Sequence, residues 1–235
     1  MSDSTITYPN ICFIGKMGSG KSTLAEYLIT QHGYTKLSFA ESLKEIVNVL
    51  NKTNSSFRAL LFAIQRYYIN PLHWFKFFLI LKEASTLVME YPKARTRLQF
   101  VGNQVREKID KNFWVNIAIK KMLKLKSIDP ELRFVIDDCR YPNELNILKK
   151  HNFFDIRVWC SDETRLERLK RLYDISSMND YRLYAESEVA LDNYACSITI
   201  STDNNDEVFD DLKFAISFFS TVYIDLKITT RVKIN

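Results

Sequence analysis

One motif near the N-terminus constrains the fold of this chain more than any other feature. Residues 15–22 read Gly-Lys-Met-Gly-Ser-Gly-Lys-Ser, after the short apolar run 11–14 and before a segment with helical apolar spacing that reaches Gln31. The pattern G-x-x-x-x-G-K-[S/T] binds phosphate when it joins a strand to a helix. A glycine-containing turn without a ligand is the plainer alternative, but both flanks match the phosphate-binding context.

Each residue type in this loop has a physical reason. The glycines permit backbone conformations that a Cβ would penalise, so successive N–H groups can turn toward phosphate oxygens. The helix N-terminus adds unpaired N–H groups and the positive end of its dipole. We expect Lys21 to reach the β- and γ-phosphates and the Ser22 hydroxyl to bind Mg²⁺. The predicted MgATP-binding residues are Gly15, Met17, Gly18, Ser19, Gly20, Lys21, Ser22 and Thr23.

The length and composition favour one intracellular globular domain. A chain of 235 residues suits a single domain, residues 1–235, with an inserted helical lobe better than two independent domains. Its net charge of +5 is small and spread along the chain, and polyphosphate substrates explain it as well as nucleic acid does. The four cysteines form no C-x-x-C pair, which indicates buried thiols in a reducing compartment. The polar first ten residues lack the apolar segment of a signal peptide, so we expect a cytoplasmic location.

Short strands alternate with helices along the chain. This alternation predicts an α/β fold with a parallel, doubly wound sheet and helices on both faces. The expected strands are 11–14, 36–40, 133–136, 156–160 and 196–200, and the expected helices are 41–50, 96–109, 112–125, 143–150, 162–173 and 206–219. The tail, 223–235, alternates like a strand, without an assigned place in the sheet.

Residues 57–91 form a segment of different character, dense in aromatic side chains and punctuated by Pro71 and Pro92. We interpret it as an inserted helical lobe whose aromatic residues pack in a core, the commoner fate of such residues. A helix that binds a membrane surface or a partner is the alternative. Arg66 and Lys76 interrupt the apolar run 57–81, so it cannot span a bilayer.

A second charged pair ends a strand. Asp138 and Arg140 follow the β-rich run 133–136, and ligands of open α/β sheets sit at the carboxyl ends of strands. The carboxylate can hold the water shell of Mg²⁺ or orient a nucleophile, and the arginine can clamp a phosphate. A purely structural ion pair is the alternative.

The expected helix 162–173 is basic. Arg165, Arg168 and Arg171 recur every three residues and therefore share one broad helical face. Such a face is commonly solvated surface, but it can also form a lid that closes over ATP and neutralises the transferring phosphoryl group. The spacing leaves both interpretations open.

Several segments together carry a family resemblance. In order they are the phosphate loop, Phe39-Ala40-Glu41-Ser42-Leu43-Lys44, Arg95-Thr96-Arg97-Leu98-Gln99-Phe100-Val101-Gly102, Phe113-Trp114-Val115, Asp138-Cys139-Arg140-Tyr141-Pro142-Asn143-Glu144 and Ser187-Glu188. Their order and spacing resemble those of the bacteriophage deoxynucleoside monophosphate kinases, which are adenylate-kinase-like P-loop kinases. The chain departs from that family at Ala185, where a histidine is expected ahead of the Ser-Glu pair.

The resemblance implies a reaction and a set of residues. The reaction is transfer of the γ-phosphoryl of ATP to a deoxynucleoside monophosphate, as part of deoxynucleotide biosynthesis in the cytoplasm, or in the host cytoplasm if the chain is viral. It implies a monophosphate-binding helical insertion at about 52–110 and a lid at about 162–185. The implied substrate-binding residues are Arg95, Gln99, Arg106, Asp138, Arg140 and Glu188, and the implied catalytic residues are Lys21, Asp138, Arg140, Arg165 and Arg168.

Two other functions stay open. The first is a P-loop kinase for another small phosphorylated metabolite. The second is a non-enzymatic nucleotide-gated switch or nucleic-acid adaptor. Because no basic cluster is dense and acidic residues are interspersed along the chain, we expect no nucleic-acid partner. Because no uncharged run is long enough to span a bilayer, we expect no membrane partner. The aromatic lobe is a candidate homodimer surface, and the base and sugar preference of the acceptor is not indicated by the residues.

Overall fold

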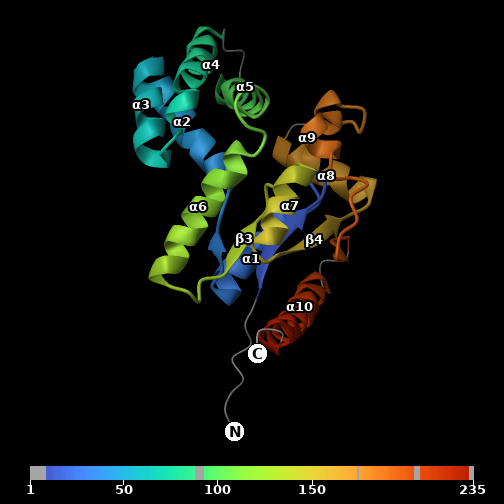
Figure 1. Cartoon of the computed structure of the whole chain (residues 1–235). Helices are drawn as coiled ribbons and strands as arrows, with labels where there is room; N and C mark the ends of the chain where they lie inside the picture. Colours follow the sequence, from blue (N-terminus) through green and yellow to red (C-terminus); the bar gives the residue numbers. More distant parts are fainter. Residues whose placement is uncertain (1–8, 88–92, 174, 204–206, 233–235) are drawn as a thin grey trace. The chain divides into compact units, whose positions relative to one another are not determined.

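The computed structural model describes residues 9–87, 93–173, 175–203 and 207–232, without the side chains of 93–95 and 222–232 (Figure 1). The chain divides into two compact units. We call Met1–Leu37 together with Lys126–Asn235 the sheet unit, and Ser38–Leu125 the helical unit.

The sheet unit contains one five-stranded sheet in which every pair of neighbours is parallel. The strand order is β2-β3-β1-β4-β5. The chain therefore passes from β1 to the edge strand β2, returns to β3 beside β1, and then continues through β4 to β5 on the other side of β1. The strands are β1 (Asn10–Ile14), β2 (Thr35–Lys36), β3 (Phe134–Ile136), β4 (Phe153–Trp159) and β5 (Ile198–Ser201). This order confirms the expected parallel, doubly wound α/β sheet.

The core of the sheet unit holds β1 in the middle of the sheet. All five residues of β1 are buried, and Ile11 and Phe13 pack with Leu24 and Leu28 of α1 (Lys21–His32) and with α10 (Val208–Val232). Each such side chain contributes about 1.5–3 kcal/mol by its burial. The loop that follows β1 therefore starts from a rigid position. The other helices of this unit are α7 (Pro142–Lys150), α8 (Asp162–Tyr173), the 3₁₀ turn η2 (Tyr181–Tyr184) and α9 (Glu186–Val189).

The helical unit is a bundle built around a buried arginine. Arg97 donates from Nη1 to Asn51 Oδ1 at 2.6 Å and from Nη2 to the Ser85 carbonyl at 3.0 Å. These bonds tie α5 to α2 and to α4 inside the unit. The elements are α2 (Phe39–Thr53), α3 (Ser56–Tyr67), the 3₁₀ turn η1 (Pro71–His73), α4 (Trp74–Thr86), α5 (Lys93–Lys108) and α6 (Phe113–Ile128), whose last turn belongs to the sheet unit.

Two expected strands differ from the structure. The strand expected at 36–40 is only Thr35–Lys36, because Ser38 takes the extended N-cap position of α2, and Glu41 lies in that helix's first turn. The tail expected to alternate as a strand continues α10 to Val232. A helix satisfies its own backbone hydrogen bonds, whereas a strand needs a neighbouring strand, and this favours continued helix past Phe219.

The cysteines and the helices bear on two further expectations. All four cysteines are free thiols; Cys12, Cys139 and Cys160 are buried, as expected, whereas Cys196 is only partly buried. A hydrogen bond with Cys12, followed by burial, raises the pKa of the Cys139 thiol well above its ordinary value, so this thiol stays protonated. Within the described parts of the chain, no helix has the length and apolar character needed to cross a bilayer.

Candidate functional site

The phosphate loop has a backbone that requires glycine. Gly15, Gly18 and Gly20 have φ values of 144°, 84° and 96°, and Gly20 is the N-cap of α1. A Cβ on Gly15 would lie 2.3 Å from the Val158 carbonyl oxygen, so no other residue fits there. A Cβ on Gly18 would lie 3.1 Å from Cγ of Arg165, which shows that α8 packs directly on the loop.

Lys21 is held inside the loop. Its Nζ donates to the carbonyls of Gly15 and Lys16, both at 2.7 Å, and only 6% of the residue is exposed. Burial, followed by the charge of the Arg140 guanidinium, lowers the pKa of Lys21 to about 7, although Glu188 and Asp137 act in the opposite direction. The charged and neutral forms of Lys21 are therefore both populated near neutral pH.

The end of β5 buttresses the loop. Thr202, which is buried, donates from Oγ1 to the Ser19 carbonyl at 2.8 Å. Arg168 donates from Nη1 to Thr202 Oγ1 at 2.8 Å and from Nη2 to the Thr202 carbonyl at 2.7 Å. The sequence reasoning did not single out Thr202, although it is a polar residue at the carboxyl end of a strand, the same signal that selected Asp138.

Replacing Thr202 with valine should destabilise the protein by about 1–3 kcal/mol, because the Ser19 carbonyl and the Arg168 guanidinium each lose a buried partner. The same change should weaken ATP binding, since the loop loses its fixed position. Thermal unfolding and ATP titration measure the two effects. Thr199→Val is the matched control, because Thr199 is exposed on the same strand. Equal stability of both variants would show that Thr202 does not buttress the loop.

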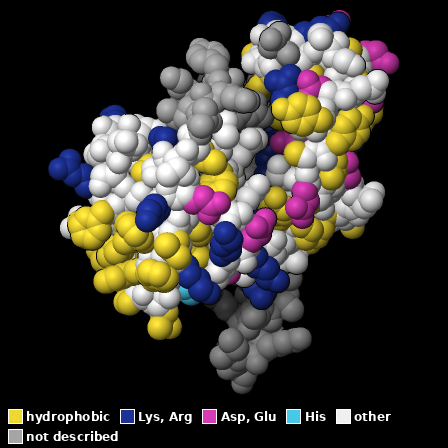
Figure 2. All heavy atoms as spheres, turned by 90° about the horizontal axis from the view of Figure 1, so that it is seen from above, with side chains coloured by type: hydrophobic (Ala, Val, Ile, Leu, Met, Phe, Trp, Pro, Cys, Tyr) yellow, Lys and Arg dark blue, Asp and Glu magenta, His cyan; other side chains and the backbone are white. Residues whose placement is uncertain are grey.

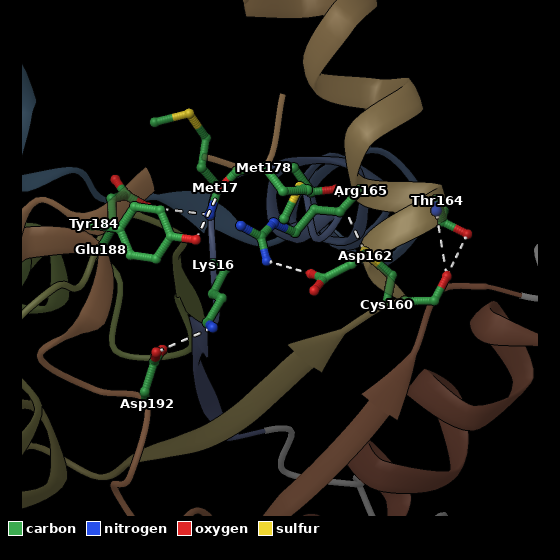
Figure 3. Close-up of polar contacts among 12 residues, drawn as sticks. Lys16, Met17, Cys160, Asp162, Thr164, Arg165, Met178, Tyr184, Glu188 and Asp192 are labelled. Atoms are coloured by element: carbon green, nitrogen blue, oxygen red, sulfur yellow. Dashed lines mark hydrogen bonds and ion pairs between the residues drawn. The ribbon is translucent and has the colours of Figure 1, made fainter. Parts of the chain in front are cut away.

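Two of the three arginines of α8, Arg165 and Arg168, lie against the loop. Arg165 is buried, its Nη1 pairs with Asp162 Oδ1 at 2.8 Å, and its Nε has no hydrogen-bond acceptor within the described residues (Figure 3). Arg168 donates a hydrogen bond to Thr202, and Arg171 is exposed. The following segment packs on α8 through Ile175 and Leu183, with Met17 and Met178 against the same cluster. The range expected to form a lid is thus packed beside the loop here.

Glu188 joins the loop to Arg140, which follows β3. One carboxylate oxygen of Glu188, Oε2, accepts from the Met17 backbone N–H at 3.1 Å and from Arg140 Nη1 at 2.7 Å. Figure 3 shows the Glu188 side chain directed at Met17. The side chain of Glu188 is only 8% exposed. A loop N–H and a guanidinium are the donors that a phosphate oxygen uses, so this carboxylate occupies an anion-binding position.

The position of Arg140 is fixed through its backbone. The Arg140 N–H and the Tyr141 N–H both donate to Glu144 Oε2, at 2.9 Å and 3.2 Å, and Glu144 is buried at the start of α7. This contact holds the turn that follows β3 and aims Arg140 at the loop. Glu144 is a positioning residue, and in the sequence it stands out only as part of the Asp138–Glu144 motif.

A small pocket opens at this anion-binding position. Arg157 of β4 supports its rim by donating from Nη2 to the carbonyls of Leu191 and Tyr194, at 2.9 Å and 2.7 Å. Asp192, which lines the pocket, forms an ion pair with Lys16 at 3.2 Å (Figure 3). The pocket is lined by Gly15, Cys139, Arg140, Arg157, Ser187, Glu188, Leu191 and Asp192. Arg157 was not among the expected site residues, because a strand interior gives no sequence signal for a contact with a distant loop.

The remaining expected residues lie in other places. Asp138 is half-buried just after β3, next to Asp137, which pairs with Lys36 at 2.9 Å. Gln99 and Arg106 belong to α5 of the helical unit, where Gln99 is exposed and Arg106 Nη1 donates to the Gly102 carbonyl at 3.4 Å. Arg95 is also in α5, with its side chain outside the described residues. The sheet unit itself brings together Lys21, Arg140, Arg165, Arg168 and Glu188 around the loop.

Comparisons with known proteins identify distant structural likenesses. No family model matches the sequence, and no curated protein matches it. Among solved structures, the chain is similar to TT1252 from Thermus thermophilus, with 16% identity over 89% of this chain and 97% of that one, at a TM-score of 0.43. It is also similar to shikimate kinase from Acinetobacter baumannii in complex with shikimate, with 16% identity over 98% of both chains, at a TM-score of 0.39. The strand order and the glycine loop after β1 by themselves make this a P-loop fold.

Proposed function

We propose that this chain is an ATP-dependent kinase that transfers the γ-phosphoryl group to a (deoxy)nucleoside 5′-monophosphate. The observation that carries the proposal is the bridge made by Glu188, whose Oε2 accepts from both Met17 N–H and Arg140 Nη1. A position that already holds one anion lies directly against the donor loop. Two adjacent anion sites suit a reaction in which both the donor and the acceptor carry phosphate.

The donor half of the reaction rests on the loop and α1. Lys21 neutralises charge on the transferring phosphoryl group, and the first-turn hydroxyl of Ser22, which is exposed, is available to Mg²⁺. Bound there, Mg²⁺ would neutralise charge on the phosphate groups. Ser19 Oγ is buried without a hydrogen-bond partner in the described structure, which fits a loop built to receive an anion.

The acceptor half rests on Arg140. Its guanidinium binds the acceptor phosphate after Glu188 gives way, and Glu144 keeps the backbone of Arg140 in position. Arg165 and Arg168 stabilise the transferred group from α8. Arg95, Gln99 and Arg106 of the helical unit contact the monophosphate, and Asp138 orients it, as the family resemblance implies. In this proposal the helical segment at about 52–110 provides the monophosphate-binding side and 162–185 provides the lid.

An acceptor panel tests the function directly. Purified full-length protein is given MgATP with each of the four deoxynucleoside monophosphates, their ribose counterparts and several non-nucleotide phosphate esters, and ADP formation is followed. We expect at least one nucleotide to stimulate ADP formation well above the rate without acceptor. Stimulation only by a non-nucleotide ester would assign the chain to the metabolite kinases instead. Tight ATP binding without transfer to any acceptor would indicate a nucleotide-gated switch.

ATP binding should depend on pH through Lys21. In the nucleotide-free protein the pKa of Lys21 is about 7, and nearby phosphate charge raises it in the complex, so binding is accompanied by proton uptake above that pH. Affinity for MgATP should be nearly constant below about pH 7 and then fall by up to about tenfold per pH unit above it. Calorimetric titration in two buffers of different ionisation enthalpy measures the proton uptake. Lys21→Met should abolish it, and unchanged proton uptake in this variant would contradict the assignment.

A further inference from the structure

A group of large apolar side chains is exposed on the helical unit, on α3, η1 and α4. Leu72 and Tyr68 are 83% and 82% exposed, and Phe75 is 71% exposed. Figure 2 shows apolar side chains gathered over this part of the surface, with basic side chains among them. We call this group the aromatic face; it consists of Phe57, Leu61, Tyr68, Leu72, Trp74, Phe75 and Leu79.

The aromatic face is separate from the core of the same helices. The opposite sides of α3 and α4 supply the buried residues of the unit, which are Ala59, Leu60, Ala63, Phe77, Ile80, Leu81 and Ala84. The sequence reasoning favoured core packing for the aromatic segment, and the structure divides the segment between a core side and an exposed side. An apolar group of this size on an exposed surface indicates a binding partner.

The turn between α3 and α4 presents its apolar residues rigidly. Trp74 donates from Nε1 to the Ile69 carbonyl at 2.8 Å, and the Leu72 N–H donates to Asn70 Oδ1 at 3.0 Å. Pro71 further restricts the backbone at the start of η1. Leu72 and Phe75 therefore project from a fixed turn, and little conformational entropy is lost when they are buried by a partner.

Basic residues predominate around the aromatic face, although Arg66 pairs with Glu45 at 3.6 Å. Residues 46–82 contain no aspartate or glutamate, and they contain five exposed basic residues, which are Lys52, Arg58, Arg66, Lys76 and Lys82. A neighbouring hollow has Leu79 and Ile80 among its lining, together with Lys76, Lys82, Lys108, Glu83 and Thr86. An apolar surface with a basic surround is complementary to a partner that is both apolar and anionic.

We propose that the aromatic face docks on the surface of an anionic lipid bilayer. Aromatic and aliphatic side chains enter the headgroup and acyl boundary, while lysine and arginine side chains bind anionic headgroups. A second copy of the chain suits this face poorly, since it would bring the same basic residues together. Nucleic acid suits it less well than a bilayer does, because three of its seven side chains, Leu61, Leu72 and Leu79, are aliphatic and give bases no stacking surface. The proposal revises the expectation of no membrane partner, which came from span length and charge pattern.

Vesicle flotation with the full-length protein tests the proposal. The probes are vesicles of phosphatidylcholine alone and vesicles of an equimolar mixture of phosphatidylcholine and phosphatidylglycerol, each over a range of salt concentrations. We expect binding to the anionic vesicles that weakens as salt increases. Lys76→Gln should lower the partition coefficient about fivefold, the effect of one basic residue near the surface.

Matched variants separate the aromatic face from general stickiness. Leu72→Ser combined with Phe75→Ser should lower vesicle binding by at least about tenfold, with unchanged circular dichroism. Leu172→Ser combined with Phe214→Ser removes two exposed apolar residues of the sheet unit and should bind like the wild type. Equal vesicle binding by both double variants would overturn the proposal. So would a concentration-dependent dimer, or binding to a single-stranded oligonucleotide, that only the Leu72 and Phe75 changes abolish.

Discussion

Replacing Lys21 with alanine should lower turnover by at least about 10³-fold, the scale of a charge clamp on a transferring phosphoryl group. Phosphoryl transfer needs little covalent help from the protein, so catalysis depends on positioning and on charge neutralisation. Lys21 is the buried cation of the loop, and its contacts with the Gly15 and Lys16 carbonyls keep its ammonium group beside the phosphate-binding backbone.

The stability of this variant separates catalysis from folding. The pKa of Lys21 is about 7 in the folded protein and near 10.5 in the unfolded chain, so the unfolded state binds more protons between these values. Burial of this side chain is therefore most unfavourable to folding below pH 7, and that cost is relieved as pH rises toward 10.5. Without nucleotide at pH 7, the thermal unfolding temperature of Lys21→Ala should be no lower than that of the wild type.

Lys16→Ala is the matched control for Lys21. Lys16 belongs to the same loop but is exposed and pairs with Asp192 at the pocket rim. Single-turnover and steady-state ADP formation should be only modestly reduced in this control. Near-normal turnover of Lys21→Ala, or an equal loss in both variants, would remove Lys21 from its catalytic role.

Replacing Arg140 with leucine should lower kcat/KM for the acceptor by about 10²–10³-fold, the effect of losing a preorganised charged donor at a reaction site. The affinity for MgATP should change little by comparison. Removal of the Arg140 charge should also raise the pKa of Lys21, because that guanidinium is the second cause of its depression. The pH above which MgATP affinity falls should therefore move upward in Arg140→Leu.

Glu188→Gln provides the complementary variant for Arg140. It keeps the shape of the side chain but removes the charge that pairs with Arg140 at 2.7 Å. If the carboxylate occupies the position of the acceptor phosphate, its neutralisation should leave the acceptor KM unchanged or lower it. Isothermal titration of each substrate, with initial rates over a grid of both concentrations, distinguishes the two variants. An Arg140→Leu protein that loses ATP binding and retains acceptor binding would place Arg140 on the donor side.

Much of the fold follows from local pattern. The strand at β1, the glycine loop and α1 were expected because an apolar run, three glycines and a helical period occur in a fixed order, and α8 was expected at its observed bounds of Asp162–Tyr173. Prediction from local pattern was wrong at two places, where helix capping or backbone hydrogen bonding decided the structure. At residues 37–40 the start of a helix replaces most of a strand, and past Phe219 a self-satisfied helix replaces an alternating segment.

The sequence by itself determined that a phosphate loop follows the first strand, that the sheet is parallel, and that Asp138 and Arg140 end a neighbouring strand. These features depend on residue types at short spacings, which the chain carries locally. Only the tertiary structure decided that Glu188, 171 residues beyond Met17, closes an anion site with Arg140, and that Thr202 locks the loop through Ser19 and Arg168. It also decided which aromatic residues of the helical unit face outward. Such contacts join residues far apart in the chain, and their geometry exists only once the core has brought the carboxyl ends of the strands together.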